Sequence, residues 1–369
     1  MFRSNILNGD DFVKKSKRFV KLAALAAMFA VTAASPSWGR AGFDFVEFGT
    51  GLLGGNSNND AYPNSKSVTI GGASNRTYSQ NAVILGGYDN YMGTDAGEYG
   101  VAIGGAHNGG TGDTSVAIGG SNNNAATTRS LAAGGYGNIA NAHYSVTIGG
   151  AKNTTTGDGA IVIGGGYAYM DGGTVYCADG NNTASGSGAA VFNGISNKAS
   201  GSYSTATGGE SNTASGSHSM VSGGRYATAS GEYSTVSGGE SNTASASYAV
   251  ASGGNDNNAA ENFSTAIGGK SNKASGSYST VSGGSHNTAS GDWSTASGGY
   301  GNTASVAYAT ASGGYGNTAE GYASSASGGV YNTASNSYST AFGGCGNTAS
   351  GTSSTASGGY GNTAEGYRA

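Results

Sequence analysis

Residues 298–312 read GGYGNTASVAYATAS, and this fifteen-residue unit recurs along most of the chain. The first residue of each Gly-Gly pair, or of its equivalent, stands at positions 54, 71, 86, 104, 119, 134, 149, 164, 178 and 193, and then at every fifteenth position from 208 to 358. These starts define 21 repeats with the consensus GGxxNTASGxYSTxS, and Ala178-Asp179 and Asn193-Gly194 replace the glycine pair in two of them. A disordered linker does not keep such a register, so the period indicates an array of stacked repeats.

The composition is compatible with either a flexible linker or a repeat array, and the period selects the array. Of the 369 residues, 71 are glycine, 10 % are charged and two are proline. The scarcity of proline excludes collagen, whose triple helix requires it. The net charge of -4 argues against nucleic-acid binding, because neutralising phosphates requires a basic face.

The repeat unit predicts a coil of β-structure. Fifteen residues are too few for two helices and a turn, and the unit has no apolar pattern of 3.6-residue period. The segments NTAS and YSTxS are short runs separated by glycine-rich turns, so each coil is predicted to hold two short strands and two bends. Stacking then places equivalent positions ~4.8 Å apart. We therefore predict an all-β, parallel β-solenoid of about 21 coils, mostly of 15 residues each.

Two positions of the unit specify the interior of the coil. The fifth residue is Asn in 19 of the 21 units, from Asn58 to Asn362, with Ala168 and Ala227 as the exceptions. Stacked Asn amides can hydrogen-bond to one another as a ladder, and Asn tolerates the left-handed backbone of a tight turn. The seventh residue is Ala in all thirteen units from position 184 onward, which indicates an interior too narrow for a larger group.

The segment before each glycine pair changes along the chain. It reads SVTI at residues 67–70 and SVAI at residues 115–118, and STVS or STAS in the later units. Alternation along a strand places Val and Ile, and later Thr and Ser, on one face. We expect one face of this strand to fill the coil and the other to meet a partner chain.

Two rows of side chains are candidates for ligand contact. Position eleven of the unit gathers aromatic residues, which we expect to stack along the axis and shield a coil edge or a chain interface, or alternatively to dock a carbohydrate or a protein. Position three carries variable and often charged groups, in a turn that should face solvent, and adjacent coils place Arg225 about 5 Å from two glutamates. The candidates are Tyr203, Tyr233, Tyr248, Tyr278, Trp293 and Tyr308 in the first row, and Glu210, Arg225, Glu240 and Lys270 in the second.

No motif predicts catalysis, a metal site or a cofactor. Glu210 and Glu240 lie two coils apart, ~9.6 Å, near the upper limit for an inverting glycosidase, but solvated charges on a turn explain them better. Gly269-Lys270-Ser271 resembles a phosphate loop, but Ser264 stands where the first glycine is required. We therefore expect no enzyme activity, no cofactor and no nucleic-acid partner.

The two cysteines are not expected to form a bond within one chain. Cys177 and Cys345 are placed about eleven coils apart, roughly 50 Å, against a Cα separation of about 7 Å that a disulfide can span. In an exported chain they either pair between molecules or remain thiols.

The N-terminal region predicts export. Five Lys and Arg residues between positions 14 and 21 precede the apolar run LAALAAMFAVTAA at residues 22–34, which is followed by SPSWG. This pattern is typical of a secretory signal peptide, and the run is shorter than the ~20 residues that cross a bilayer. We assign residues 1–39 to the signal peptide, residues 40–66 to an N-terminal cap and the first coil, and residues 67–369 to the repeat solenoid.

At SVAIGG (residues 115–120), SVTIGG (residues 145–150) and the many SGGxxNTASGxYSTxSGG units, the sequence resembles the haemagglutinin-type head repeats of trimeric autotransporter adhesins, the YadA-like family. The likeness covers about residues 50–369. It implies a left-handed parallel β-roll, a homotrimeric head, and attachment of a Gram-negative cell to host extracellular matrix, to cell-surface proteins or glycans, or to another surface.

The resemblance also bears on location. Family members continue into a coiled-coil stalk and a membrane anchor, and this sequence contains neither heptads nor closing amphipathic strands. We expect either a fragment of a longer adhesin at the outer membrane, attached only through that missing anchor, or a released extracellular protein.

An ice-binding or other secreted structural solenoid is the alternative. Thr recurs at positions six and thirteen of the unit, which produces regular rows on flat strands. The two rows are expected on different strands, without a Thr-x-Thr pair on one strand, so the adhesin interpretation is preferred.

Overall fold

The computed structural model describes residues 52–54, 60–61, 67–93, 98–171, 174–178 and 180–369. The predicted signal peptide and most of the predicted N-terminal cap lie outside these residues. The chain divides into two units, and the second, Val46–Ala369, contains every described residue. Within the described residues the secondary structure consists of strands and turns, and no helix there is long and apolar enough to cross a membrane.

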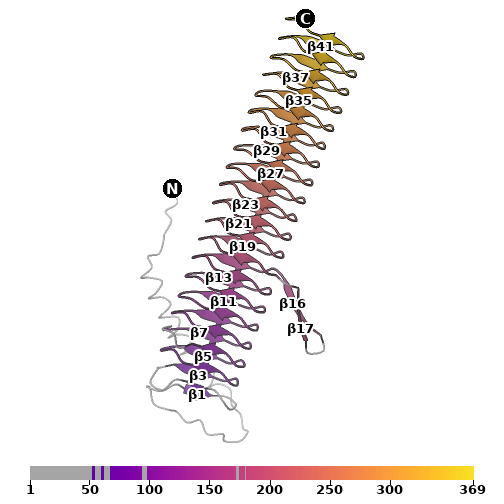
Figure 1. Ribbon diagram of the computed structural model, residues 1–369. Helices are drawn as coiled ribbons and strands as arrows, with labels where there is room; N and C mark the ends of the chain where they lie inside the picture. Colours follow the sequence, from indigo (N-terminus) through magenta and orange to yellow (C-terminus); the bar gives the residue numbers. More distant parts are fainter. Residues whose placement is uncertain (1–51, 55–59, 62–66, 94–97, 172–173, 179) are drawn as a thin grey trace, which may run out of the picture. The chain divides into compact units, whose positions relative to one another are not determined.

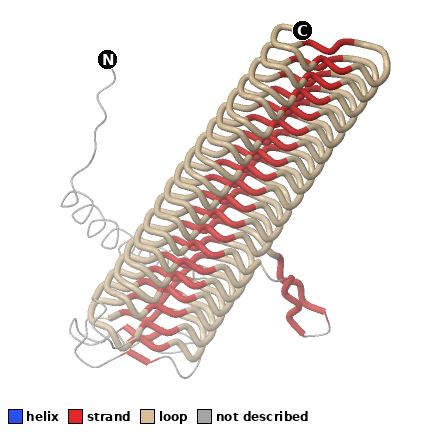
Figure 2. The backbone as a smooth tube through the Cα atoms, turned by 45° about the horizontal axis from the view of Figure 1, so that its top comes forward, coloured by secondary structure: helices blue, strands red, loops and turns tan. Residues whose placement is uncertain are grey.

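The described coils stack as a parallel β-solenoid, which confirms the predicted fold class (Figure 1). Each coil contributes a strand of three residues to one sheet, sheet 1, and a strand of two residues to another, sheet 2. Sheet 1 has 20 strands, which corresponds to about 19 turns of roughly 15 residues. Figure 2 shows the strands of successive coils in register along the stack, with the turns at its edges.

The bounds of the strands follow the repeat closely. Sheet 1 contains β1 (Leu52–Gly54), β3 (Val68–Ile70), β5 (Val83–Leu85), β7 (Val101–Ile103), β9 (Val116–Ile118), β11 (Leu131–Ala133), β13 (Val146–Ile148), β15 (Ile161–Ile163), β19 (Ala190–Phe192), β21 (Thr205–Thr207), β23 (Met220–Ser222), β25 (Thr235–Ser237), β27 (Val250–Ser252), β29 (Thr265–Ile267), β31 (Thr280–Ser282), β33 (Thr295–Ser297), β35 (Thr310–Ser312), β37 (Ser325–Ser327), β39 (Thr340–Phe342) and β41 (Thr355–Ser357). Sheet 2 contains β2 (Asp60–Ala61), β4 (Arg76–Thr77), β6 (Tyr91–Met92), β8 (Gly109–Gly110), β10 (Asn124–Ala125), β12 (Ile139–Ala140), β14 (Thr154–Thr155), β18 (Thr183–Ala184), β20 (Lys198–Ala199), β22 (Thr213–Ala214), β24 (Thr228–Ala229), β26 (Thr243–Ala244), β28 (Asn258–Ala259), β30 (Lys273–Ala274), β32 (Thr288–Ala289), β34 (Thr303–Ala304), β36 (Thr318–Ala319), β38 (Thr333–Ala334), β40 (Thr348–Ala349) and β42 (Thr363–Ala364).

One predicted coil is a hairpin instead. Strand β15 pairs directly with β19, and β14 pairs directly with β18, so the coils on either side of the insertion are neighbours. The intervening chain forms the antiparallel pair β16 (Tyr167–Asp171) and β17 (Thr174–Ala178), which leaves the stack (Figure 1). The coil start predicted at Ala178-Asp179 is therefore wrong. The error arose because the insertion is almost as long as a coil, so the glycine pairs around it kept an apparent period.

The hairpin changes two further assignments. Ala168 belongs to β16 and is no exception to the Asn row. Cys177 was predicted to occupy a coil position, but it pairs in register with Ala168 on the hairpin. Cys345, at position three of its coil, is a free thiol.

The interior of the coils is filled by small side chains. Positions seven and fourteen of the unit point inward, as shown by Ala304 and Ala311, both 0 % exposed. This confirms the narrow interior predicted from the Ala row. The same interior row also accommodates Val and Ile, as at Val236 and Ile84, both 0 % exposed. At the largest buried group, Met92, glycines make room: its side chain occupies the space that Cβ atoms on Gly100 and Gly110 would need. Such volume compensation is what a close-packed interior requires.

The Asn row forms a ladder, but not the predicted one. The Asn257 Oδ1 atom accepts a hydrogen bond from the backbone N–H of Asn272, at 3.1 Å. Its Nδ2 group donates to the carbonyls of Gly253, at 2.9 Å, and Gly269, at 3.4 Å. The amides therefore bond to backbone groups of their own coil and of the next coil, and not to one another.

The prediction that Asn itself adopts the left-handed backbone of the turn is also wrong. The left-handed residue is the one before it, for example Asp256 with φ of 58°. Asn occupies the fifth position because its amide satisfies backbone groups of its own coil and of the next one, as Asn257 does for Gly253, Gly269 and Asn272.

Candidate functional site

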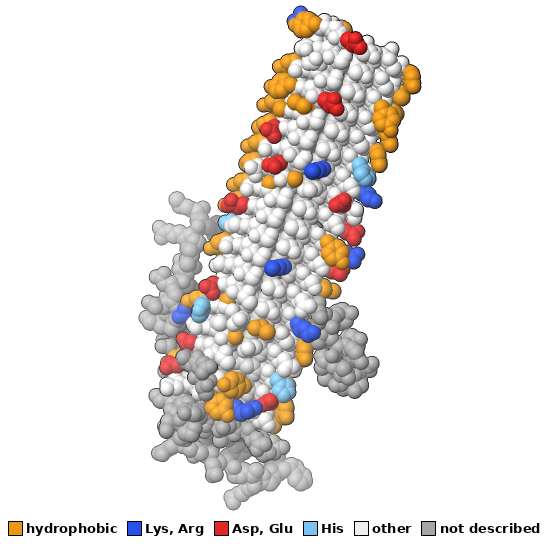
Figure 3. Space-filling model, viewed as in Figure 1, with side chains coloured by type: hydrophobic (Ala, Val, Ile, Leu, Met, Phe, Trp, Pro, Cys, Tyr) orange, Lys and Arg blue, Asp and Glu red, His pale blue; other side chains and the backbone are white. Residues whose placement is uncertain are grey.

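Three surface rows run along the stack and are the candidates for binding. They are the outer face of sheet 1, the aromatic row at position eleven, and the row at position three. Figure 3 shows hydrophobic side chains gathered in rows along both edges of the stack. Each row arises because a parallel stack without slippage places equivalent residues above one another.

The outer face of sheet 1 begins as an apolar surface. The middle residue of each strand is buried and its two neighbours point outward: in β9, Ala117 is 0 % exposed and Ile118 is 38 % exposed. We call the outward residues of β3 to β15 the apolar strip. Its members are Val68, Ile70, Val83, Leu85, Val101, Ile103, Val116, Ile118, Leu131, Ala133, Val146, Ile148, Ile161 and Ile163. After β19 the same positions carry mostly Thr and Ser. An apolar surface of this extent, confined to one part of a face, is typical of an interaction surface.

The aromatic row stacks as predicted over seven consecutive coils. We call these seven residues the ring column: Tyr203, His218, Tyr233, Tyr248, Phe263, Tyr278 and Trp293. Neighbouring ring centroids lie between 5.2 Å (Tyr203 to His218) and 4.0 Å (Tyr278 to Trp293) apart. All these residues adopt a left-handed backbone, with φ between 55° and 59°. That conformation costs roughly 1–2 kcal/mol per residue, and each ring pair offsets it by about 0.5–1.5 kcal/mol.

Tyr308 does not extend the ring column, although it was predicted in the same row. Its ring instead meets Tyr322 edge-on, with centroids 5.4 Å apart at 71°. Tyr322 in turn meets Tyr338 at 79°. The stacked run therefore ends at Trp293.

The stacking limits what the ring column can bind. Each ring inside the column turns both faces toward other rings and presents its edge to solvent. Binding of a sugar ring by C–H packing needs an open aromatic face. The column interior therefore does not supply the carbohydrate platform that was one of its predicted roles.

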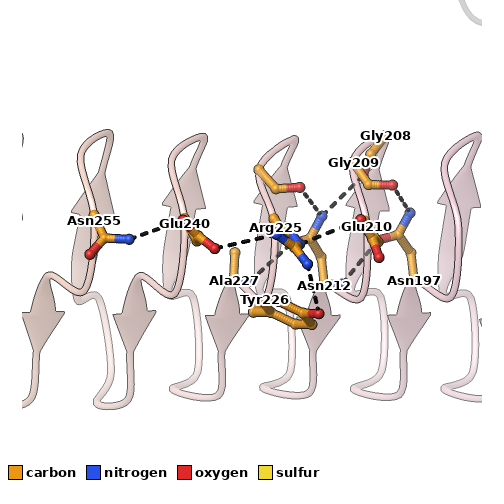
Figure 4. A network of polar contacts seen from close by, with 11 residues as sticks. Asn197, Gly208, Gly209, Glu210, Asn212, Arg225, Tyr226, Ala227, Glu240 and Asn255 are labelled. Atoms are coloured by element: carbon orange, nitrogen blue, oxygen red, sulfur yellow. Dashed lines mark hydrogen bonds and ion pairs between the residues drawn. The ribbon is translucent and has the colours of Figure 1, made fainter.

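The charged row at position three forms the predicted alternating column (Figure 4). Single-residue bridges join Glu210 to Arg225 and Arg225 to Glu240 along the backbone. The Arg225 guanidinium lies 3.5 Å from the Glu210 carboxylate and 3.6 Å from that of Glu240. The Asn255 amide donates to Glu240 at 3.2 Å, and Lys270 follows in the same bridge column. Arg225 also donates to the Tyr226 hydroxyl, which, with the two glutamates, raises the pKa of its guanidinium.

This charged column is expected to contribute little to folding. All three charged side chains are about half exposed, so water and salt screen their attraction. We predict that Arg225→Ala leaves the thermal unfolding midpoint unchanged within error, at low and at physiological salt. Differential scanning calorimetry against the unsubstituted chain measures this, and a clear drop at both salt concentrations would contradict it.

Two clusters escaped the sequence analysis because position three and four residues were treated as merely variable. Tyr300 and Tyr315 stack at 5.1 Å, and the Tyr331 ring meets Tyr315 edge-on at 5.2 Å. The hydrogen bond between the hydroxyls of Tyr315 and Tyr331 raises the pKa of Tyr315. The recurrence of Tyr at positions 300, 315 and 331 was the available signal.

The second cluster is an ion group near the first coils. The Asp89 carboxylate accepts from Arg76 at 2.7 Å and contacts His107 Nδ1 at 3.0 Å. The Arg76 hydrogen bond is the main cause that lowers the pKa of Asp89. Only three groups meet here, on an exposed edge, and no chemistry follows from them.

The described residues contain no group of three or more His, Cys, Asp or Glu side chains placed to hold a metal ion. Comparison of the sequence with protein-family models and with curated proteins finds no match. The stacked fold and its three surface rows are therefore the structural features from which a function can be inferred.

Proposed function

We propose that this chain is the head of a cell-surface adhesin, a left-handed β-roll that assembles as a homotrimer and attaches cells to host matrix, cell-surface proteins or glycans, or other surfaces. It is exported, and it acts by binding, without enzymatic activity. The proposal is supported by the likeness of the repeats to YadA-like heads, by the signal-peptide pattern at residues 1–39, and by the parallel β-solenoid.

The apolar strip is the main observation that supports the proposed trimer. The inner face of sheet 1 already fills the coil, so the strip is a second apolar surface on the same strands. Covering the exposed Val and Ile side chains with a partner would contribute about 25 cal/mol of free energy for each Å² of apolar surface removed from water. Identical copies that turn these columns toward a common axis cover them with an equally regular surface.

Assembly is tested by giving two strands of the strip the residues of the later coils. The variant combines Val101→Thr, Ile103→Ser, Val116→Thr and Ile118→Ser, which are the residues that β31 carries natively. We expect multi-angle light scattering to give the mass of three chains for the unsubstituted protein and of one chain for the variant.

The matched control alters two later strands, with Thr280→Ala, Ser282→Ala, Thr295→Ala and Ser297→Ala. It should keep the trimeric mass. If the unsubstituted protein has the mass of one chain, the proposed trimer is wrong. If the variant keeps the mass of three chains, the apolar strip does not mediate assembly.

Adhesion itself is tested with beads that carry the purified chain. Beads are offered immobilised matrix proteins, glycans and cultured cells, with beads of an unrelated β-protein as the control. Saturable retention on at least one surface is expected, and retention no higher than the control across all surfaces contradicts the adhesin.

A second candidate, an ice-binding solenoid, gains one specific observation. Thr205 and Thr207 both point outward from β21, so the expectation that no Thr-x-Thr pair occurs on one strand was wrong. Strands β31 to β37 likewise carry a hydroxyl at both outward positions. A thermal-hysteresis measurement on the purified chain tests whether it binds ice, and the absence of hysteresis excludes this candidate.

A further inference from the structure

The ring column forms a continuous, pre-ordered surface on one edge of the stack. Its seven rings span six coil steps, about 29 Å at the strand spacing of ~4.8 Å. Each ring is partly open to solvent, from 42 % for Tyr278 to 62 % for Tyr203. Because the rings are already held by their neighbours, a ligand orders few side chains on binding, which favours affinity.

We propose that the ring column is a binding site for an elongated, planar aromatic cation that lies along the stack axis. The length of the surface favours a rod-shaped molecule over a compact one. Its regular spacing means that the ligand meets the edge of an aromatic ring at each step, so a flat molecule keeps contact over its whole length.

The residues beside the rings make room for such a molecule. Position ten, next to each ring, is occupied by Ser202, Ser217, Glu232, Ser247, Asn262, Ser277 and Asp292. Most of these side chains are much smaller than the rings. A flat ligand can therefore rest against the flank of the ring column while it covers the low row at position ten.

The charge of the surroundings selects a cation. Glu232, Glu261 and Asp292 are exposed within or beside the row, and positions nine to eleven of the seven coils contain no Lys or Arg. The Asp292 Oδ1 atom accepts from the backbone N–H of Ser277 at 3.0 Å, which fixes its carboxylate against the stack. A polyanion such as nucleic acid is repelled by these carboxylates. A neutral glycan does not find open ring faces inside the column.

Thioflavin T, a planar benzothiazolium cation, is the probe for the full-length protein. We expect a saturable rise in its fluorescence, with an induced circular dichroism band. The double variant Tyr248→Ser, Phe263→Ser interrupts the column in its middle and should weaken the dissociation constant at least tenfold. Ser is native at this position in a later coil, as Ser353 with φ of 58°, so the variant is expected to fold.

The matched control removes rings from the opposite edge, with Tyr300→Ser and Tyr315→Ser, and should bind the probe as the unsubstituted chain does. A third variant, Glu232→Gln with Asp292→Asn, should weaken binding several-fold at low salt and less at high salt. Far-ultraviolet circular dichroism verifies the fold of each variant.

Three results overturn the proposal. They are no saturable signal from the unsubstituted chain, equal loss of binding in the ring-column and opposite-edge variants, and unchanged affinity when the ring column is interrupted. Binding that an anionic planar dye reproduces with the same affinity overturns the choice of a cation.

Discussion

Gly254→Ala is expected to destabilise its coil by more than ~3 kcal/mol, because a left-handed backbone penalty adds to a steric clash. Gly254 is the second residue of its glycine pair and has φ of 72°. A Cβ atom there falls on the carbonyl oxygen of Gly269 in the next coil, and 2.7 Å from the Asn257 amide nitrogen. Backbone cannot move aside without disturbing the stack in both directions.

The first glycine of the same pair is the matched control. Gly253 has φ of 66°, and a Cβ atom on it meets nothing within 4 Å. Gly253→Ala is therefore expected to cost only the left-handed penalty of about 1–2 kcal/mol. Urea unfolding together with hydrogen exchange of amides in residues 240–285 measures both variants. Equal losses for the two glycines would contradict the clash argument.

Asn257→Ala is expected to cost about 3 kcal/mol, because it removes three hydrogen bonds and leaves the Asn272 N–H without an acceptor. The partners are the Asn272 N–H and the carbonyls of Gly253 and Gly269. The two carbonyls each keep one hydrogen bond: the Gly253 carbonyl from the Asn242 amide and the Gly269 carbonyl from the Asn255 N–H. The asparagine itself is fully buried, so water does not replace its amide. Because each repeat contacts only its neighbours, the loss should concentrate in adjacent coils. Hydrogen exchange of the Asn272 amide should accelerate most.

At Ala227 the native chain already has Ala in place of the Asn of the repeat, so the opposite substitution can be tested there. The backbone N–H of Ala227 donates to Asn212 Oδ1 at 2.9 Å, but Ala227 has no side-chain oxygen to offer Asn242 in the next coil (Figure 4). The residue before it, Tyr226, keeps the left-handed backbone of the repeat, with φ of 55°. Ala227→Asn should restore the ladder and add about 1–2 kcal/mol of stability. A neutral or destabilising result would show that the ladder is not needed at every coil.

The repeat period was enough to predict the parallel stack and its interior. A residue type that recurs every fifteen positions must fit the same space in each coil, so the Ala row at Ala304 and its equivalents predicts a narrow interior. The aromatic row was predictable for the same reason, since unslipped coils bring equal positions into contact. The hydrogen-bond partners of the Asn amides were not predictable, because the sequence does not distinguish a hydrogen bond between two side chains from one between a side chain and the backbone.

The sequence by itself thus determined the coil, its period, its small-residue core and the stacking of the rows, because these depend on contacts between neighbouring repeats. The tertiary structure alone decided that residues 167–178 form a hairpin outside the stack, since that outcome depends on whether β15 pairs with β19 across the insertion. It also decided that the rings separate after Trp293 and that Val and Ile face outward from β3 to β15. Those outcomes depend on rotamers and on which face of a strand meets the coil interior, and a one-dimensional period specifies neither.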